Sequence, residues 1–423
     1  MKKYPKKTIG ELCNIIKGET GIASATPGEY PLVVTAKERK TSATYQFDTQ
    51  AVCIPLVSSS GHGKKSLKYV HYQEGKFALG TILAAVIPKN HYEISAAFLH
   101  QYLFFYKETK IVPLMKGAAN VSLAVKDIAK IEVPLPPINQ QKDFIIFFNK
   151  LQKFNQELIR EFDNQQKYIY QLKQAILQEA ISGQLTAEWR KQNPIQKGNP
   201  DTDAAALLAK IKAEKQQLIA DGKLKKEKPL PEILPDEIPF SLPDSWVWCR
   251  LGKCSLNRDD NRQPISRDER LNKEKIFPYY GASGIIDKID GFTHEGINLL
   301  IGEDGANLIS RSTPIAFVAD GKYWVNNHAH VIGFTDISIL HFIKHHINAI
   351  DLKPYVTGGF QPKLTQGNLS SIIIALPPLA EQKAIVEKVD YLMKIIDQLE
   401  AQIKHRKQLA EDLMQTVLRE AFE

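Results

Sequence analysis

The chain repeats one pattern after 241 residues. Residues 117–123 lead through a Leu-Pro-Pro run into a Gln-Lys pair at 141–142, and residues 358–364 lead through a second Leu-Pro-Pro run into a Gln-Lys pair at 382–383 (382 − 141 = 241). An ungapped match at a single offset indicates an internal repeat, and this period is far too long for a solenoid. The sequence therefore predicts two copies of a domain followed by a long helix, with pseudo-twofold symmetry and a target that has two related halves.

The composition is that of a globular protein with a modest excess of positive charge. Hydrophobic residues make up 43% and charged residues 24% of the 423 residues, which are ordinary values, and the length predicts two or three domains. The net charge of +8 fits a polyanion partner without requiring one. No apolar run reaches the roughly 18 residues of a membrane helix, and no apolar signal segment follows the basic start, so we expect a cytoplasmic protein.

Changes of pattern along the chain predict an α+β protein with five segments. Short β-branched runs separated by turns predict two globular domains, at residues 1–135 and 244–376. Residues 136–185 and 377–423 are predicted to form two long helices. The lysine- and proline-rich residues 186–243 predict a connector that contains one short helix. A solvated linker is the favoured interpretation of this connector, and a DNA-contacting arm is the alternative.

The two predicted helices carry matching apolar seams. Apolar residues recur at alternating steps of four and three, which is the spacing of a coiled coil. Neither helix can bury such a stripe against its own small domain, so the sequence predicts that the helices pack antiparallel on each other as a rigid spacer. The seams include Phe144, Phe148, Leu151 and Leu158 in the first helix and Ile385, Val389, Leu392 and Leu399 in the second.

The chain carries no catalytic constellation. It has no P-loop, no glycine-rich dinucleotide or methyl-donor motif, and no acidic group with nuclease spacing. We interpret residues 259–260 as a solvated acidic loop, and the pair His328 and His330 as a packed strand end rather than a metal site. The four cysteines match neither a metal-ligand nor a disulfide pattern and predict buried thiols. We therefore predict no catalytic, cofactor-binding or metal-binding residue in this chain.

What remains is binding chemistry in loops. Basic side chains that follow strands suit contacts with phosphates, and polar side chains in glycine-bounded loops suit contacts with base edges. Ordinary β-turns with basic rims are the alternative for any single loop. The candidate DNA contacts are Lys37, Arg39, Lys64, Lys65, Asn120 and Ser122 in the first domain and Tyr279, Tyr280, Ser283, Asn307, Gln361 and Lys363 in the second.

These features together resemble the specificity (S) subunits of type I restriction-modification enzymes. The resemblance covers nearly the whole chain and rests on the repeated Pro-Pro…Gln-Lys helix starts and on the segments 180–190, 279–285, 302–307 and 358–364. It implies that each domain is a target-recognition domain that reads one half of a bipartite DNA site. Because the two domains differ in their loops, the resemblance implies an asymmetric site.

The resemblance also implies partners. The paired helices would set the spacer between the half-sites and dock two methyltransferase (M) subunits, with the seam residues named above as interface candidates. Restriction (R) subunits would complete the assembly, and S-adenosylmethionine, ATP and Mg²⁺ would belong to those partners and not to this chain. One alternative is the recognition portion of a fused restriction-methylation enzyme, although this chain lacks the motifs for either reaction. Another is a non-enzymatic coiled-coil scaffold, which would not explain two loop-rich domains built differently on one frame.

Overall fold

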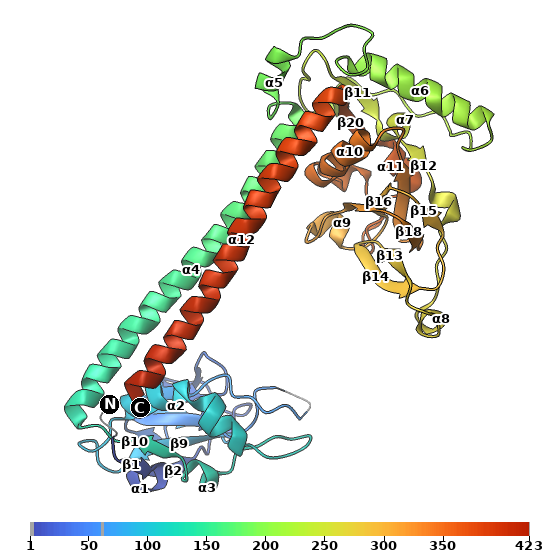
Figure 1. Ribbon diagram of the computed structural model, residues 1–423. Coiled ribbons are helices and arrows are strands. Elements are labelled where there is room, and N and C mark those ends of the chain that lie inside the picture. The colour runs from blue at the N-terminus through green and yellow to red at the C-terminus, as the bar shows by residue number, and fades with distance from the viewer. Residues whose placement is uncertain (1–3, 61–62, 423) are drawn as a thin grey trace. The chain divides into compact units, whose positions relative to one another are not determined.

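The computed structural model describes residues 4–60 and 63–422, which belong to two compact units. Residues 1–164 and 403–423 make up the first unit, and residues 165–402 make up the second. Two long helices, α4 (Ile138–Ser182) and α12 (Leu379–Phe422), contribute to both units (Figure 1).

Three small sheets build the domain of the first unit. One has the strand order β2-β9-β6-β7, a second has the order β4-β3-β8-β5, and a two-stranded sheet pairs β1 with β10. Neighbouring strands are antiparallel except β3 and β8, which run parallel with Leu32 opposite Ala78. The strands are β1 (Lys6–Thr8), β2 (Cys13–Lys17), β3 (Tyr30–Val33), β4 (Lys40–Ser42), β5 (Phe47–Asp48), β6 (Ala51–Pro55), β7 (His71–Gln73), β8 (Lys76–Leu79), β9 (Leu83–Pro88) and β10 (Glu132–Pro134).

Strand β6 lies at the centre of this domain. All five of its residues are buried, because both of its faces are covered. Successive side chains of a strand point to opposite faces, and β6 follows this rule: Val52 and Ile54 join an apolar cluster with Phe98 of helix α2 (Ala96–Phe105), whereas Cys53 joins a separate cluster with Phe77 of β8. The continuous apolar sequence of β6 is therefore explained by packing on two sides.

The domain of the second unit repeats this arrangement strand for strand. Its sheets have the orders β12-β19-β16-β17, β14-β13-β18-β15 and β11-β20, and β13 and β18 form a parallel pair in the place of β3 and β8. The predicted α+β class and internal repeat are thus confirmed. The strands are β11 (Val247–Arg250), β12 (Leu256–Asn257), β13 (Phe277–Gly281), β14 (Gly284–Ile289), β15 (His294–Glu295), β16 (Asn298–Gly302), β17 (Ala316–Ala319), β18 (Lys322–Val325), β19 (Ala329–Gly333) and β20 (Ile373–Leu376).

The helices of the two domains also correspond, with additions in the second. Helices α1 (Ile9–Leu12), α2 and α3 (Val125–Ile128) match α7 (Leu251–Cys254), α10 (Ile337–Ala349) and α11 (Gln366–Ser371) in their places between the strands. The second domain adds α8 (Arg267–Leu271) before β13 and α9 (Asn307–Ser310) after β16. The loops also differ: residues 34–39 join β3 to β4, whereas residues 282–283 alone join β13 to β14.

The two long helices run antiparallel where they meet in the second unit. Lys173 of α4 pairs with Asp397 of α12 at 3.2 Å, and Lys388 of α12 donates to the carbonyl of Leu185, just beyond the end of α4, at 2.8 Å. From the first contact to the second, the residue number rises from 173 to 185 along α4 and just past its end, and falls from 397 to 388 along α12. The two helices therefore run in opposite directions, which confirms the predicted antiparallel pairing (Figure 1).

The connector between the first long helix and β11 contains a helix that packs on the second domain. The predicted short helix is present as α6 (Ala204–Ala220), which buries Leu207 and Ile211. The side chain of Asp203 accepts a hydrogen bond from the Ala205 N–H and so caps the start of α6. The solvated linker favoured from the sequence is therefore wrong for α6, which packs against α7. No helix in the described parts of the chain is both long and apolar enough to cross a membrane.

Candidate nucleic-acid interface

A tight hairpin at residues 357–363 stands at the surface of the second domain; we call it the second hairpin. The N–H of Thr357 donates to the carbonyl of Lys363 at 2.8 Å, and the N–H of Lys363 returns the bond at 2.7 Å. Gly358 adopts a φ of 86°, and a Cβ there would lie 2.5 Å from the carbonyl oxygen of Gln361. Only glycine fits this turn without strain.

The first domain has the same hairpin 241 residues earlier, at residues 116–122; we call it the first hairpin. Lys116 and Ser122 exchange two backbone hydrogen bonds of 2.8 Å, and Gly117 has a φ of 124° with a Cβ position 2.2 Å from the carbonyl oxygen of Asn120. Asn120 and Ser122 therefore occupy the positions that Gln361 and Lys363 occupy in the second hairpin. The two segments that match in sequence therefore also have the same backbone hydrogen bonds.

Each hairpin is held by a neighbouring loop through the same two backbone bonds. In the second domain, Leu364 N–H donates to Glu303 at 2.7 Å and Gly305 N–H donates to Pro362 at 3.0 Å. In the first, Leu123 N–H donates to the carbonyl of Leu56 at 2.8 Å and Ser58 N–H donates to that of Val121 at 3.0 Å. The backbone frame is the same in both domains, so the differences between the two sites lie in their side chains.

The side chains at the two hairpin tips differ in size and chemistry. Phe360 of the second hairpin is fully exposed, at 110% of its reference surface, whereas the equivalent residue of the first hairpin is Ala119. Asn120 and Gln361 are both exposed and present amide groups at equivalent positions. The sequence analysis did not single out Phe360. An aromatic residue between a Gly-Gly pair and a Gln-Pro pair was the signal for it, because such a turn holds a large side chain away from the core.

A buried charged network lies beneath the second hairpin. Lys363 Nζ is 3.1 Å from Glu303 Oε1, and Arg262 donates to the other oxygen of the same carboxylate. Burial alone would raise the pKa of Glu303, but the hydrogen bonds from Arg262 and Lys363 and the charge of His330 together outweigh it and hold the pKa below its ordinary value. Lys363 is thus half-exposed and paired within the chain.

Asp259 extends this network into the core. Its carboxylate accepts hydrogen bonds from the N–H of Val331 at 2.7 Å and lies 2.7 Å from Nδ1 of His330, whose Nε2 is 2.8 Å from the carbonyl oxygen of Leu364. Burial is the largest single influence and would raise the pKa of Asp259, but the hydrogen bond and charge of His330, the Val331 N–H and the charge of Arg262 together lower it below its ordinary value. The expected solvated loop at 259–260 is wrong for Asp259, which is buried. Both ring nitrogens of His330 are engaged, and no metal-binding group of His, Cys, Asp and Glu occurs in the described residues.

The first domain brings two of its predicted groups together. Lys64 and Lys65 are exposed on a loop that adjoins the first hairpin, since a Cβ on Gly63 would lie 2.2 Å from the carbonyl oxygen of Ala118. The hydroxyl of Ser58 braces this loop by donating to the Lys64 carbonyl at 2.6 Å. Asn120, Ser122, Lys64 and Lys65 can therefore face one ligand.

Lys37 and Arg39 lie apart from that cluster in sequence, on the β3–β4 loop. Lys37 is exposed, but the guanidinium of Arg39 is occupied within the fold: it donates to the side chain of Gln73 at 3.1 Å and to the carbonyl of Tyr72 at 3.2 Å. Burial, followed by the charge of Arg39, lowers the pKa of the neighbouring His71 to about 4. Arg39 braces its loop, which does not fit the phosphate contact predicted for it.

The aromatic pair of β13 points inward. Tyr279 is 1% exposed, its hydroxyl accepts the Ile265 N–H at 3.0 Å, and its ring lies 4.6 Å from the guanidinium carbon of Arg270. Tyr280 packs on Phe317 in a core cluster. The DNA contacts predicted for Tyr279 and Tyr280 therefore do not fit the structure, because strand pairing in the interior buries both rings.

The two remaining candidates of the second domain lie near Glu303. Ser283 is exposed in the turn between β13 and β14, and this turn adjoins the Glu303 loop, since a Cβ on Gly302 would be 2.8 Å from the Ala282 carbonyl oxygen. Asn307 is half-buried, and its amide oxygen accepts the N–H of Thr313 at 3.0 Å. Asn307 thus shapes its own loop, whereas Ser283, Gln361 and Lys363 present polar groups to the surface.

The long helices bury some of the predicted interface residues within this chain. Phe148, Ile385 and Val389 are 2%, 0% and 0% exposed, so the partner contact predicted for them does not fit the structure. Phe144 is half-buried and packs edge-on against Phe98, and Leu151, Leu158 and Leu392 are also half-buried. Leu399 remains exposed, together with further large apolar side chains of α4 and α12: Ile146, Phe147, Phe154, Tyr168, Tyr170, Leu172, Tyr391, Ile395, Leu409 and Leu413.

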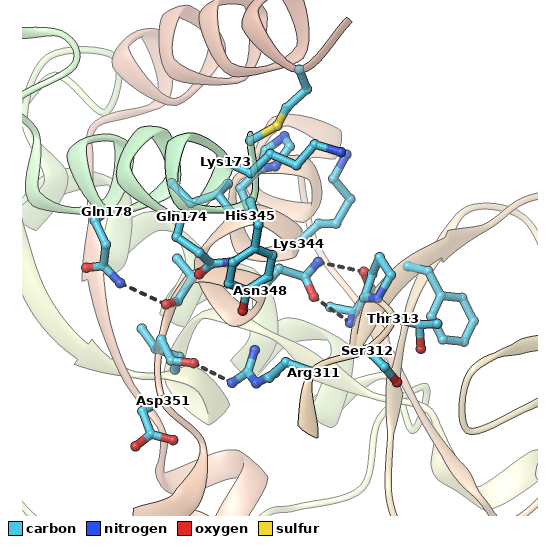
Figure 2. Close-up of a pocket in the computed structure, with 18 of the residues that line it drawn as sticks. Lys173, Gln174, Gln178, Arg311, Ser312, Thr313, Lys344, His345, Asn348 and Asp351 are labelled. Atoms are coloured by element: carbon cyan, nitrogen blue, oxygen red, sulfur yellow. Dashed lines mark hydrogen bonds between the residues drawn. The ribbon is translucent and has the colours of Figure 1, made fainter. Parts of the chain in front are cut away.

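A separate hollow of about 880 Å³ lies between α4, α10 and α12 in the second unit (Figure 2). Its charged groups already serve the fold. Arg311, which has a left-handed φ of 53°, donates to the Ile347 carbonyl at 3.2 Å at the end of α10, and His345 lies 3.0 Å from Asp390 of α12. The amide of Asn348 bonds both backbone groups of Ala316, as the dashed lines show. The polar residues that line the hollow therefore hold α10 against the neighbouring elements.

Comparison with known proteins places this geometry among relatives. The family model described as "Type I restriction modification DNA specificity domain" matches residues 1–168 and 254–406. The type I restriction enzyme EcoEI specificity subunit of Escherichia coli is 30% identical over 261 residues, which cover 56% of this chain and 42% of that protein. The EcoDI specificity subunit of the same species is 24% identical over 432 residues, which cover 98% of this chain and 87% of that protein.

The chain thus spans about two fifths of the length of the EcoEI relative that it matches. A solved structure described as "Structural basis underlying complex assembly and conformational transition of the type I R-M system" has a TM-score of 0.65 to this chain at 15% identity. That likeness covers 100% of this chain and 98% of the other, and at this level of identity it concerns the fold alone.

Proposed function

We propose that this chain, which belongs to the family of type I restriction modification DNA specificity domains, is a non-catalytic DNA-recognition subunit. Each of its two domains reads one half of a bipartite site, and the site is asymmetric. The chain acts in the cytoplasm, where it meets the DNA of its host.

One observation carries this proposal. The first and second hairpins share their backbone frame and the loop bonds that hold it, while their tips differ at Ala119 and Phe360, at Asn120 and Gln361, and at Ser122 and Lys363. The backbone frame is the same in both hairpins, but the side chains at the tips differ. This arrangement suits two domains that both bind DNA but recognise different sequences, since base edges are distinguished by the side chains that reach them. Amides at Asn120 and Gln361 can pair with a base edge, and Lys363 can contact a phosphate.

The exposed apolar side chains of the two long helices support docking of partner subunits. Single apolar residues on a surface need no explanation, but a row such as Phe154, Tyr168 and Leu172 on α4 is unusual for a protein that acts alone. We assign these faces to two methyltransferase subunits, with restriction subunits completing the assembly. S-adenosylmethionine, ATP and Mg²⁺ are bound by those partners, and the purified chain alone neither cleaves nor methylates DNA.

Exchange of the hairpin tips tests the proposal. The double variant Phe360→Ala/Gln361→Asn gives the second hairpin the tip of the first, and Ala119→Phe/Asn120→Gln does the reverse. Methylome sequencing of a host with the wild-type gene, without it, and with each variant should show a bipartite motif that depends on the gene. Each exchange should change or relax one half-site only, and a different half for each variant.

Three outcomes would contradict this function. A methylome that does not depend on the gene would remove the recognition role altogether. Exchanges that leave both half-sites unchanged while the protein stays folded would show that the hairpins are not the reading elements. Methyl transfer by the purified chain would favour the fused-enzyme alternative.

A further inference from the structure

The lysine-rich run at residues 223–228 is fixed to the second domain by an ion pair between its own Glu227 and a buried lysine. Lys215 of α6 is 8% exposed, and its ammonium donates to the carbonyls of Gly252 at 2.6 Å and Ser255 at 2.8 Å and pairs with Glu227 at 2.7 Å. A buried ammonium is stable only where such partners surround it. This bond therefore fastens the end of the lysine run, at Glu227, to the body of the domain.

A second buried cation fastens the chain that follows the run. Arg250 of β11 is 5% exposed, donates to the carbonyl of Glu232 at 2.8 Å, and pairs with Glu237 at 2.7 Å. The hydrogen bond from Arg250 is the largest of the causes that lower the pKa of Glu237. With anchors at Glu227 and Glu232, the lysine run has a defined place on the domain surface.

The run lines a pocket of about 600 Å³ that is rich in positive charge. The opposite wall is formed by Asn257, Arg258, Asn261 and Gln366. Lys225 pairs with Asp260 across the pocket, at 3.1 Å, and both side chains are largely exposed, so this pair is weak. Within residues 4–60 and 63–422, the ammonium groups of Lys226 and Lys228 have no ion-pair partner.

We propose that residues 223–228 and Arg258 form a phosphate-binding shelf for the DNA backbone beside the half-site that the second domain reads. This inference rests on the proposed function. A series of hydrogen bonds connects the shelf to the second hairpin. Gln366 of the pocket wall donates to Asp259 at 3.3 Å, and Asp259 bonds His330. His330 in turn bonds the carbonyl of Leu364, the residue directly after the hairpin. A strand that reaches the hairpin can therefore continue over the lysines.

The shelf supplies affinity that does not depend on sequence. Lysine and arginine neutralise phosphates and release counterions, and each contact on double-stranded DNA contributes about 0.9 to the slope of log K against log salt. Amides such as that of Asn257 can add hydrogen bonds to phosphate oxygens. From the sequence, a DNA-contacting arm is only the less favoured interpretation of this segment. Composition alone cannot show that α6 and Arg250 hold the segment against the domain.

A salt titration tests the shelf without knowledge of the target sequence. The probe is a duplex of about 40 base pairs with arbitrary sequence, bound by the full chain between 50 and 200 mM salt. The test variant is Lys226→Gln/Lys228→Gln. The matched control, Lys210→Gln/Lys212→Gln, removes the same charge from exposed positions of α6 in the same connector that do not line the pocket. Circular dichroism should show that both variants are folded.

We expect the slope of log K against log salt to be smaller by about 2 in the test variant. Over this fourfold range of salt, the factor by which affinity falls should therefore be about 12 times smaller in the test variant than in the wild type. The control should keep the wild-type slope within about half a unit. Equal slopes in the test variant and the wild type would overturn the shelf and leave the recognition function standing. An equal loss in both variants would also overturn it, because the effect would then be one of net charge. Failure of the wild type to bind duplex DNA even at 50 mM salt would count against the recognition function itself.

Discussion

The side-chain amides of Gln141 and Gln382 make the same hydrogen bond 241 residues apart. Each donates through Nε2 to the carbonyl of the proline five residues earlier, Pro136 or Pro377, at 2.8 Å, and each residue is fully buried. The bond ties the turn after β10 or β20 to the first turn of the long helix. The repeated Gln-Lys pair of the sequence therefore marks a structural joint, and its glutamine is not available to DNA.

The two joints should differ in strength. Gln141 also accepts the N–H of Ser95 at 2.9 Å and donates to the carbonyl of Glu93 at 2.9 Å, whereas Oε1 of Gln382 has no partner in the described chain. An unsatisfied buried polar group costs about 1–3 kcal/mol. We expect Gln141→Leu to lower the free energy of unfolding by several kcal/mol more than Gln382→Leu. Urea denaturation of both variants measures this, and equal losses would contradict it.

A second contrast between the repeats concerns Glu381, whose equivalent in the first copy is Gln140. The Glu381 carboxylate is fully buried and is bonded by Arg190, by Thr186 at 2.7 Å and by Trp246 Nε1 at 2.8 Å. Gln140 is exposed and accepts a hydrogen bond from the Tyr4 hydroxyl at 3.0 Å.

Removal of one partner of a buried ion pair leaves the other charge uncompensated, at a cost of about 3–5 kcal/mol. Glu381→Ala should therefore destabilise the chain by that amount, while Gln140→Ala should cost less than about 1 kcal/mol. Thermal or urea unfolding of the two variants side by side measures the difference. A mild Glu381→Ala would show that the Arg190 charge is solvated when its partner is removed.

Local pattern was enough to predict the repeat, the long helices and the equivalence of residues 117–123 and 358–364. The spacing of residues such as Phe162 and Ile403 on a helix, and the need for glycine at 117 and 358, are properties of short stretches of sequence. The network around Glu303 was not predictable in this way. It joins Asp259, Arg262, His330 and Lys363, which are up to about 100 residues apart, and only the packing of β19 against the hairpin brings them together.

The errors at Tyr279 and Arg39 have the same origin. Both residues carry groups that suit DNA: Arg39 follows a strand, and Tyr279 belongs to a strand that leads into a glycine-bounded turn. Which face of a strand is buried depends on the sheet that covers it, and Tyr279 lies on the covered face of β13. The bracing role of Arg39 could not be predicted, because its partners, the Tyr72 carbonyl and Gln73, lie on β7, 33 and 34 residues away.

Lys363 can be tested against its equivalent in the first hairpin. If its ammonium contacts a phosphate in the complex, Lys363→Gln should weaken binding to all DNA sequences alike and lower the salt slope by about 1. Ser122→Lys, at the equivalent exposed position of the first hairpin, should raise the slope by about 1. If Lys363→Gln instead keeps the slope and lowers the unfolding temperature, the residue is only the partner of Glu303.

The network beneath the second hairpin should respond to acid. The pKa values of Glu303 and Asp259 in the folded chain lie below their ordinary values of 4.5 and 3.8. A group with a lowered pKa in the folded state stabilises that state above its ordinary pKa, and this stabilisation is lost as the pH falls through the folded value. Protection of the second hairpin should therefore be constant from pH 7 to about 5 and fall below about pH 4.5.

Hydrogen exchange of residues 357–363, corrected for the intrinsic rate at each pH, measures this protection. The control is the chain with Glu303→Gln, because the first hairpin has a carboxylate contact of its own, between Lys116 and Asp127 at 3.5 Å. Acid sensitivity of the second hairpin that is unchanged in this variant would show that Glu303 is not the cause. In Glu303→Gln the acid sensitivity of the second hairpin should be reduced.

The spacer function of the long helices gives the last prediction, and the structure changes where it should be tested. The segment 181–186, where the first helix ends, is the simplest place for a four-residue insertion as judged from the sequence alone. That segment is built into the fold: Gly183 has a φ of 79° and lies against Pro243 and Trp246, and Thr186 bonds Glu381. An insertion there would break this junction before it changed any length.

Seven residues inserted in each helix, beside the contact of Asp163 with Lys407, keep the seam in register, because seven is the period of a coiled coil. Each insertion adds about 10 Å at 1.5 Å per residue. DNA advances about 3.4 Å per base pair, so the unspecified spacer of the recognition site should lengthen by about three base pairs.

The half-site sequences should stay as they are, since both hairpins are untouched. Methylome sequencing of the double-insertion variant reads the new spacer directly. Insertion in α4 alone is the matched control: it shifts one seam against the other and should abolish modification rather than lengthen the spacer. A double-insertion variant that still modifies DNA at the original spacing would show that the paired helices do not measure distance.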